Sequence, residues 1–285
     1  MSRLVAITPA RDEEKLLPGL ISCMAMQRCL PERWIVINDG SVDATGEILD
    51  TAARRYHWIE AHHLPRNGSR AAGGESVTMR FLPCEEWHNW DYFLRLDADL
   101  TFAEDFIESL LAEFSRDAQL GVAGPILLEP DGTQWREVTV PLFHVRGAAK
   151  MFTAECFQAI GGQDGGLGFD TVDELHAMML GFRSRHFSHI RAYHHRPQGA
   201  AGSSWRARLM AGRAAYRSGY SMLFMLARAA AHLFRPPPLF GSVMMLAGYF
   251  EGFVRRIPRA ASPELVRFVR RQQLRRLLML ETVWR

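Results

Sequence analysis

Residues 34–45 read Trp34-Ile35-Val36-Ile37-Asn38-Asp39-Gly40-Ser41-Val42-Asp43-Ala44-Thr45, a short apolar run that ends in an acidic turn. The apolar run over residues 34–38 predicts a buried strand, and a helix is expected over residues 43–56. The Asp43 carboxylate can cap the N-terminus of that helix. A strand that passes through a turn directly into a helix is the repeating unit of layered α/β proteins.

The same order of elements appears on both sides of this stretch. Upstream, residues 4–8 read as a strand, and residues 13–27 carry apolar side chains at helical spacing. Downstream, residues 92–96 read as a strand that ends in Asp97-Ala98-Asp99, and residues 102–114 suit a helix. Further strand-like segments cover residues 122–127, 137–143 and 186–192. The first two hundred residues therefore predict an α/β/α sandwich of Rossmann-like layout.

Composition excludes several classes of protein. A chain of 285 residues that is 48% hydrophobic can bury a large core, which rules out a disordered or fibrous protein. The four cysteines form no CxxC pair and no zinc-like spacing, so we expect reduced thiols rather than disulfides or structural zinc. Met1 leads directly into the first strand without the features of a signal peptide, and we expect a cytoplasmic protein.

Charge is distributed unevenly along the chain. Residues 196–285 hold 16 of the 34 Lys and Arg but only 3 of the 31 Asp and Glu, a net charge of +13, which leaves −10 for the first 195 residues. We therefore expect two parts, an α/β domain over residues 1–200 and a basic, apolar helical appendage over residues 201–285.

The appendage contains two mostly apolar segments, residues 218–234 and 239–254, separated by Pro236-Pro237-Pro238. Neither reaches the roughly 18 to 20 uninterrupted apolar residues of a membrane-spanning helix. A helix expected over residues 263–280 mixes arginines with apolar side chains, which suits a helix lying on an anionic membrane surface. The alternative is packing on the α/β domain or on a second subunit, with the arginines in water. Nucleic acid is not expected as a partner, because no nucleic-acid-binding motif accompanies the charge.

Acidic residues follow two of the expected strands. Because ligands of open α/β sheets sit at the carboxyl ends of strands, Asp39 and the pair Asp97 and Asp99 would converge on one crevice if their strands are neighbours. An Asp-x-Asp pair on a turn can bind a hard divalent cation and, through it, a diphosphate. Alternatively, the pair only caps the helix that begins near residue 102.

Four ordered motifs carry a resemblance to a known family. They are Thr8-Pro9-Ala10-Arg11-Asp12-Glu13-Glu14, Ile35 through Thr45 of the opening stretch, Asn67-Gly68-Ser69-Arg70-Ala71-Ala72-Gly73, and Leu96-Asp97-Ala98-Asp99. In order and spacing they resemble the family 2 glycosyltransferases, inverting enzymes of GT-A fold. The resemblance implies a GT-A catalytic domain over residues 1–200, whose nucleotide-sugar-binding half is about residues 1–100 and whose acceptor half is about residues 101–200.

The resemblance also implies roles for individual residues. Donor-binding residues would be Pro9, Arg11, Glu13, Asp39, Arg70, Asp97 and Ala98. Asp99, together with Asp97, would hold Mg²⁺ or Mn²⁺. Asn38 stands where many members have a second Asp, which leaves the nucleotide base open. UDP is expected by family frequency, with GDP and dTDP as alternatives.

An inverting displacement also needs a carboxylate that accepts the proton of the acceptor hydroxyl. Residues 170–176 resemble the family's acidic acceptor-side motif, and the catalytic candidates are Asp173 and Glu174. Asp173 is favoured as the base, although this chain has Asp-Glu where most members have Glu-Asp. The alternative is that these carboxylates only favour the helix dipole.

The last cluster of side chains that could bind a ligand is Tyr193-His194-His195-Arg196. A late histidine completes the metal site of many GT-A enzymes, so the resemblance makes either His194 or His195 a candidate metal ligand. Arg196 could contact phosphate. Paired histidines on a surface loop are also common without any ligand.

The resulting hypothesis is a metal-dependent, inverting hexosyltransferase that acts on a nucleotide-sugar donor and a saccharide or lipid-linked acceptor. It resembles bacterial enzymes of surface-polysaccharide assembly, and we expect it at the cytoplasmic face of the membrane. One alternative is a catalytically inactive scaffold or binding protein. Another is a nucleotidyltransferase, which would need a glycine-rich phosphate loop after the first strand. The oligomeric state stays open.

Overall fold

The computed structural model describes residues 2–66, 81–82, 84–162, 169–196, 204–233 and 239–284, and for residues 169, 170 and 204 it describes the backbone only. The statements below concern these residues.

Strands and helices alternate through most of the chain. In chain order they are β1 (Leu4–Ala10), α1 (Leu17–Ala25), β2 (Arg33–Asp39), α2 (Thr45–Arg55), β3 (Ile59–Leu64), the 3-10 helix η1 (Cys84–Asn89), β4 (Tyr92–Leu96), β5 (Leu100–Phe102), α4 (Phe106–Arg116), β6 (Leu120–Asp131), β7 (Gln134–Glu137), β8 (Ala149–Thr153), α5 (Ala154–Ala159), α6 (Phe169–Met179), β9 (Arg183–His194), α7 (Ser204–Arg217), α8 (Met222–Ala231), α9 (Phe240–Val254) and α10 (Pro263–Leu277).

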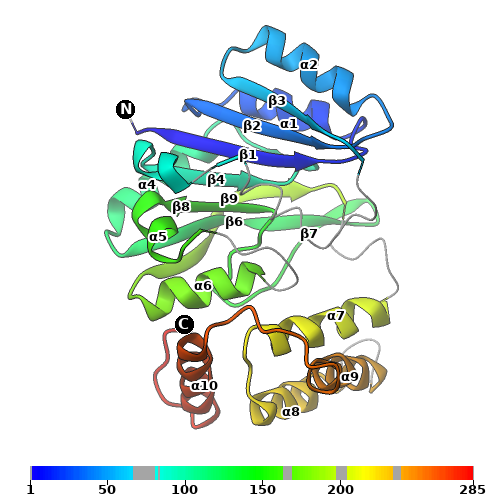
Figure 1. Ribbon diagram of the computed structural model, residues 1–285, viewed down its shortest axis with the longest axis vertical. Coiled ribbons are helices and arrows are strands. Elements are labelled where there is room, and N and C mark those ends of the chain that lie inside the picture. Colours follow the sequence, from blue (N-terminus) through cyan, green and yellow to red (C-terminus); the bar gives the residue numbers. More distant parts are fainter. Residues whose placement is uncertain are drawn as a thin grey trace.

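One mixed sheet forms the centre of the molecule, with the strand order β3-β2-β1-β4-β8-β6-β9-β5 and β7 paired to β6 (Figure 1). β1 is parallel to β2 and to β4, and β2 is parallel to β3. The carboxyl ends of β1, β2 and β4 therefore meet at one edge of the sheet, which is where ligands of such sheets bind.

Alternating side chains of the central strands fill a core on each face of the sheet. In β2, Trp34 and Val36 pack in the core beneath α1, α2 and α4, whereas Ile35 and Ile37 pack in the opposite core with α5. Both faces are buried, which explains why the strand reads as a continuous apolar run rather than an alternating one. Burial of each such side chain stabilises the fold by about 1.5–3 kcal/mol.

The C-terminal helices form a layer of their own beyond α6 (Figure 1). Val172 and Leu175 of α6 join Leu265 and Val269 of α10 in a third apolar cluster. This cluster connects the layer to the α/β part. Among the described residues, no helix has the length and apolar character needed to cross a membrane.

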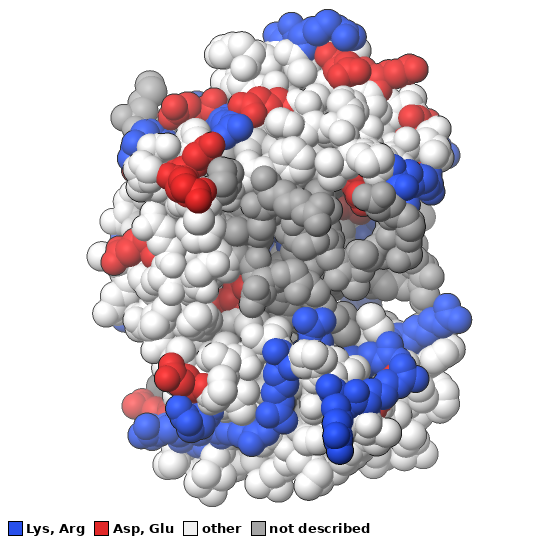
Figure 2. All heavy atoms as spheres, viewed as in Figure 1, with Lys and Arg blue, Asp and Glu red and all other residues white. Residues whose placement is uncertain are grey.

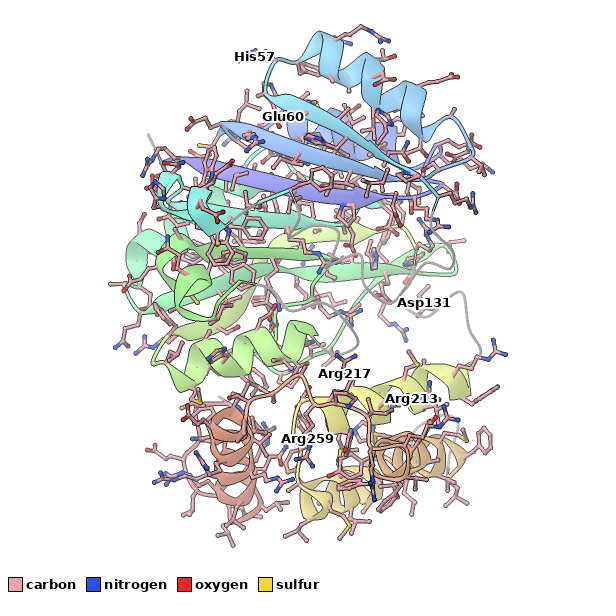
Figure 3. All side chains as sticks on the ribbon, in the orientation of Figure 1. His57, Glu60, Asp131, Arg213, Arg217 and Arg259 are labelled. Carbon is pink, nitrogen blue, oxygen red and sulfur yellow. The ribbon has the colours of Figure 1, made fainter. Side chains whose placement is uncertain are left out.

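Helices α7 and α9 approach each other at glycines. A Cβ atom added to Gly212 would lie 1.9 Å from the Met245 carbonyl oxygen, and one added to Gly248 would lie 2.0 Å from the Leu209 carbonyl oxygen. Arg213, which is labelled on α7 in Figure 3, pairs with Glu251 of α9 at 2.7 Å between Nε and Oε2. Only glycine allows such close backbone packing.

The structure confirms the α/β class and the strands expected at residues 4–8, 34–38 and 92–96. The strand expected over residues 137–143 is wrong, because β7 ends at Glu137. Pro141 has no N–H to continue the ladder, and its carbonyl oxygen instead accepts a hydrogen bond from His144 N in a turn. The helix expected from residue 102 begins at Phe106, because residues 100–102 form β5. Strands β3, β5 and β8 and helices α5 and α7 were not predicted.

Candidate active site

The loops after β1 and β2 are tied together at the carboxyl edge of the sheet. Arg11 Nη1 lies 3.4 Å from Asp39 Oδ2, and the Asp12 N–H donates to Ser41 Oγ at 2.9 Å. Asp12 itself has a φ of 54°, a left-handed conformation that Asp tolerates better than most residues. Pro9 is paired in register with Ile37. Two of the motifs therefore form one continuous wall.

Asp97, Asp99 and His194 come together next to this wall. One potential ligand atom from each lies within 4.8 Å of the others. The pair follows β4, and His194 ends β9, which reaches the site because it is paired with β5. Glu129 of β6 adds a further carboxylate, with Oε1 at 3.5 Å from His194 Nδ1.

The composition and burial of this group fit a divalent cation. Carboxylate oxygens and an imidazole are suitable ligands for such an ion. The side chain of Asp97 is 33% exposed, whereas those of Asp99 and His194 are 10% and 8% exposed, so the group opens to solvent on one side only. His194 Nδ1 is buried and makes no well-aligned hydrogen bond among the described residues, and its ionic contact with Glu129 Oε1 is long at 3.5 Å.

Charges in the group stabilise one another. Burial by itself would raise the pKa of Asp99, but His194 and Arg196 outweigh burial, so the pKa is lowered and the carboxylate is ionised. Burial likewise disfavours the charged form of His194, but Asp99 and Glu129 raise its pKa to about 9. The neighbouring carboxylates thus favour the protonated form of His194.

Arg196 connects the acidic group to the first loop. Its guanidinium pairs with Glu13 and also lies 3.4 Å from Asp99 Oδ2. The Glu13 side chain is 10% exposed, and its carboxylate raises the pKa of Arg196 further. The two residues therefore bring the end of β9 and the loop after β1 to one site.

His195 is not part of this group. Successive side chains of a strand point to opposite faces, so only one of two adjacent histidines can face the carboxylates. His195 Nε2 instead lies 2.8 Å from Thr101 Oγ1, and its ring packs edge-on against Trp135.

Glu174 is fully buried and has three partners. Its Oε1 lies 2.8 Å from Lys150 Nζ and accepts a hydrogen bond from Val145 N at 2.8 Å, while Oε2 lies 2.8 Å from His144 Nδ1. Burial alone would raise the pKa of Glu174, but His144 and Lys150 lower it. Both carboxylate oxygens are therefore occupied by the protein itself.

Asp173 lies on the same helix and is 3% exposed. Burial, and after it the charge of Asp173, raises the pKa of the Cys156 thiol in α5 to about 12. Arg70 and the rest of the third motif lie outside the described residues, as do residues 163–168 of the glycine-rich loop.

Several residues of the site were not identified from the sequence. They are Glu129, His144 and Lys150. Lys150 did carry a signal, because it is one of only two lysines among 34 basic residues. Glu129 and His144 stand in no motif.

A mixed sheet between helices, with carboxylates and a histidine gathered beyond the ends of its strands, fits the class of GT-A nucleotide-sugar glycosyltransferases. Residues 5–161 match the model of the family "Glycosyl transferase family 2". Because this match covers more than half of the chain, the protein belongs to that family.

Solved structures share the fold. TarS residues 1–349 of S. aureus, in complex with UDP-GlcNAc, is 14% identical with a TM-score of 0.57, over 93% of this chain and 79% of that one. The mannosyltransferase PcManGT of Pyrobaculum calidifontis, in complex with GDP-Man and Mn²⁺, is 14% identical with a TM-score of 0.57, over 94% and 78%. At such identities the likeness shows the fold alone. A search of curated protein sequences found no match.

Proposed function

We propose that the protein is an inverting, metal-dependent hexosyltransferase that moves a sugar from a nucleotide diphosphate to an acceptor hydroxyl, in polysaccharide or glycolipid assembly. The observation that carries this proposal is the group of Asp97, Asp99 and His194 at the carboxyl edge of the sheet. The acceptor we propose is a saccharide on a lipid carrier.

The nucleotide would bind along the wall formed by the first two loops. The base and ribose would be held by Pro9, Arg11, Glu13 and Asp39. Asp97 and Ala98 would lie next to the ribose, and Arg70 would contact the phosphates. We propose UDP first as the nucleotide of the donor. TarS is described with UDP-GlcNAc and PcManGT with GDP-Man, so GDP is the alternative nucleotide that we propose.

Mg²⁺ or Mn²⁺ would be held by Asp97, Asp99 and His194. Such an ion neutralises charge that develops on the leaving diphosphate. Arg196 adds a fixed positive charge 3.4 Å from Asp99. We propose Asp173 as the base that accepts the proton of the acceptor hydroxyl, since Glu174 is engaged with Lys150 and His144.

The two histidines provide a sharp test of the metal group. We expect His194→Ala to weaken Mn²⁺ binding in the presence of UDP by at least about 10- to 100-fold, because an imidazole ligand is lost. His195→Ala is the matched control, and we expect it to change Mn²⁺ affinity less than threefold, by titration calorimetry. Equal losses in the two variants would exclude His194 as the specific ligand.

The C-terminal helices would rest on an anionic membrane surface at the cytoplasmic side. Figure 2 shows Lys and Arg gathered over this layer, whereas Asp and Glu are spread over the α/β part. Large apolar side chains are also exposed there, including Leu223 of α8 at 60% and Val243 of α9 at 59%. Exposed apolar residues next to arginines favour binding to anionic lipid.

Nucleotide titration tests the proposed function directly. UDP, GDP and dTDP are titrated into the folded protein with and without Mn²⁺, and then into Asp99→Ala. We expect metal-dependent binding of one nucleotide, and we expect the substitution to weaken it at least a hundredfold. If a folded protein binds none of the three, the enzyme proposal fails and the scaffold hypothesis takes its place.

A further inference from the structure

A cavity of about 780 Å³ lies between the α/β part and the C-terminal helices. Its walls come from residues 139–144, from Thr171 at the start of α6, from α8, and from the segment at and after the end of α10. The volume falls within the range of about 300–1,000 Å³ that is usual for small-molecule sites.

Aromatic rings form one wall of this cavity. Trp284 stacks on Phe143 with ring centroids 5.7 Å apart, and Tyr220 stacks on Trp284 at 6.3 Å. Phe224 meets Trp284 edge-on at 6.0 Å. The packed rings provide a preformed apolar surface, which suits a hydrocarbon chain better than a sugar hydroxyl.

Positive charge lines the same cavity. Arg228 of α8 and Arg276 of α10 both line the cavity and have no carboxylate partner among the described residues. His144 also lines the cavity, with its Nδ1 held by Glu174. Two guanidinium groups without a carboxylate partner beside an apolar wall favour an anion, and arginine binds phosphate well through paired hydrogen bonds.

The cavity is connected to the candidate metal group through one short chain segment. Residues 139–144 line the cavity, and four residues later the Ala148 carbonyl oxygen accepts a hydrogen bond from Asp97 N at 2.8 Å. Between them, Arg146 Nη2 lies 3.5 Å from Glu129 Oε1. The wall of the cavity and the backbone contact of Asp97 are therefore four residues apart along the chain.

We propose that this cavity binds a phosphorylated single-chain amphiphile, with its phosphate or diphosphate between Arg228 and Arg276 and its hydrocarbon chain against Phe224 and Trp284. Binding of the amphiphile stands on the cavity alone. Its role as the carrier of the acceptor hydroxyl rests on the proposed function.

The test is a calorimetric titration of the full chain with farnesyl phosphate below its micellar concentration. We expect Arg228→Gln combined with Arg276→Gln to weaken binding at least tenfold. Arg267→Gln on the exposed side of α10 is the matched control and should leave the affinity unchanged. Ala227→Trp, which fills the cavity without removing a charge, should also abolish binding, with thermal unfolding used to verify that each variant is folded.

Three further ligands identify which part of the amphiphile is recognised. We expect farnesol, inorganic phosphate and dihexanoyl phosphatidylglycerol each to bind at least tenfold more weakly than farnesyl phosphate. The inference is overturned if any of them binds as tightly, or if Arg267→Gln loses as much affinity as the double variant. It is also overturned if the protein binds nucleotide and Mn²⁺ but not farnesyl phosphate, and that result would leave the proposed transferase function standing. If the protein binds farnesyl phosphate but binds none of the three nucleotides, that result would instead refute the transferase function alone.

Discussion

Asp173→Asn should lower the rate of sugar transfer by about 10²- to 10⁴-fold while leaving nucleotide affinity unchanged. Asparagine has the same shape but cannot accept the acceptor proton, and a positioned general base contributes about this much to a rate. The loss should appear in kcat, because the donor is held by other residues, at the ends of β1, β2 and β4.

The measurement combines a transfer assay with the nucleotide titration on the same preparation. Asp50→Asn, an exposed aspartate on α2, is the matched control and should keep full activity. Activity of Asp173→Asn within threefold of the wild type would remove Asp173 as the base. If both activity and nucleotide affinity fall, Asp173 supports the structure of the site rather than the chemistry.

Lys150→Met should lower the free energy of unfolding by about 3–5 kcal/mol, because it leaves the Glu174 carboxylate charged and buried without its ammonium partner. Denaturant unfolding at neutral pH measures this loss. The lowered pKa of Glu174 means that its ionised form stabilises the wild type above the ordinary pKa of 4.5, and that this contribution is lost as pH falls. The difference between variant and wild type should therefore shrink in acid.

The other lysine of the chain provides the control. Lys15 is exposed, and Lys15→Met should change stability by less than about 0.5 kcal/mol. Adding Glu174→Gln to Lys150→Met should restore part of the loss, because no unpaired charge then remains buried. An unchanged free energy of unfolding in Lys150→Met alone would contradict a structural role for the pair.

Strands with both faces buried could be predicted from the sequence because their apolar runs are continuous. The apolar runs that form β1, β2 and β4 are continuous in this way. Strand β3 was missed because it lies at the edge of the sheet and carries Glu60, His62 and His63, which are only partly buried or exposed. The small strand β8 and helix α7 have no pattern strong enough to stand out from their surroundings.

That Asp39, Asp97 and Asp99 lie at one edge of the sheet could also be predicted, since parallel strands end at one edge. Their strands are not neighbours, because β1 lies between β2 and β4. The choice between His194 and His195 could not be made, because it depends on which side chain at the end of β9 lies on the same side as the carboxylates that follow β4. The pairing of Lys150 with Glu174 depends on how α6 packs against β8. That arrangement is fixed by tertiary contacts rather than by any local sequence pattern.

The segment of residues 139–148 has a thermodynamic consequence if both proposed sites bind their ligands, because one end of it lines the cavity and the other end contacts Asp97. Any ligand that shifts this segment at one end changes the free energy of binding at the other. Linkage requires the effect to be mutual, so a molecule in the cavity that tightens the donor site is itself held more tightly once the donor is bound. Ordered binding of two substrates can arise in this way without the movement of a domain.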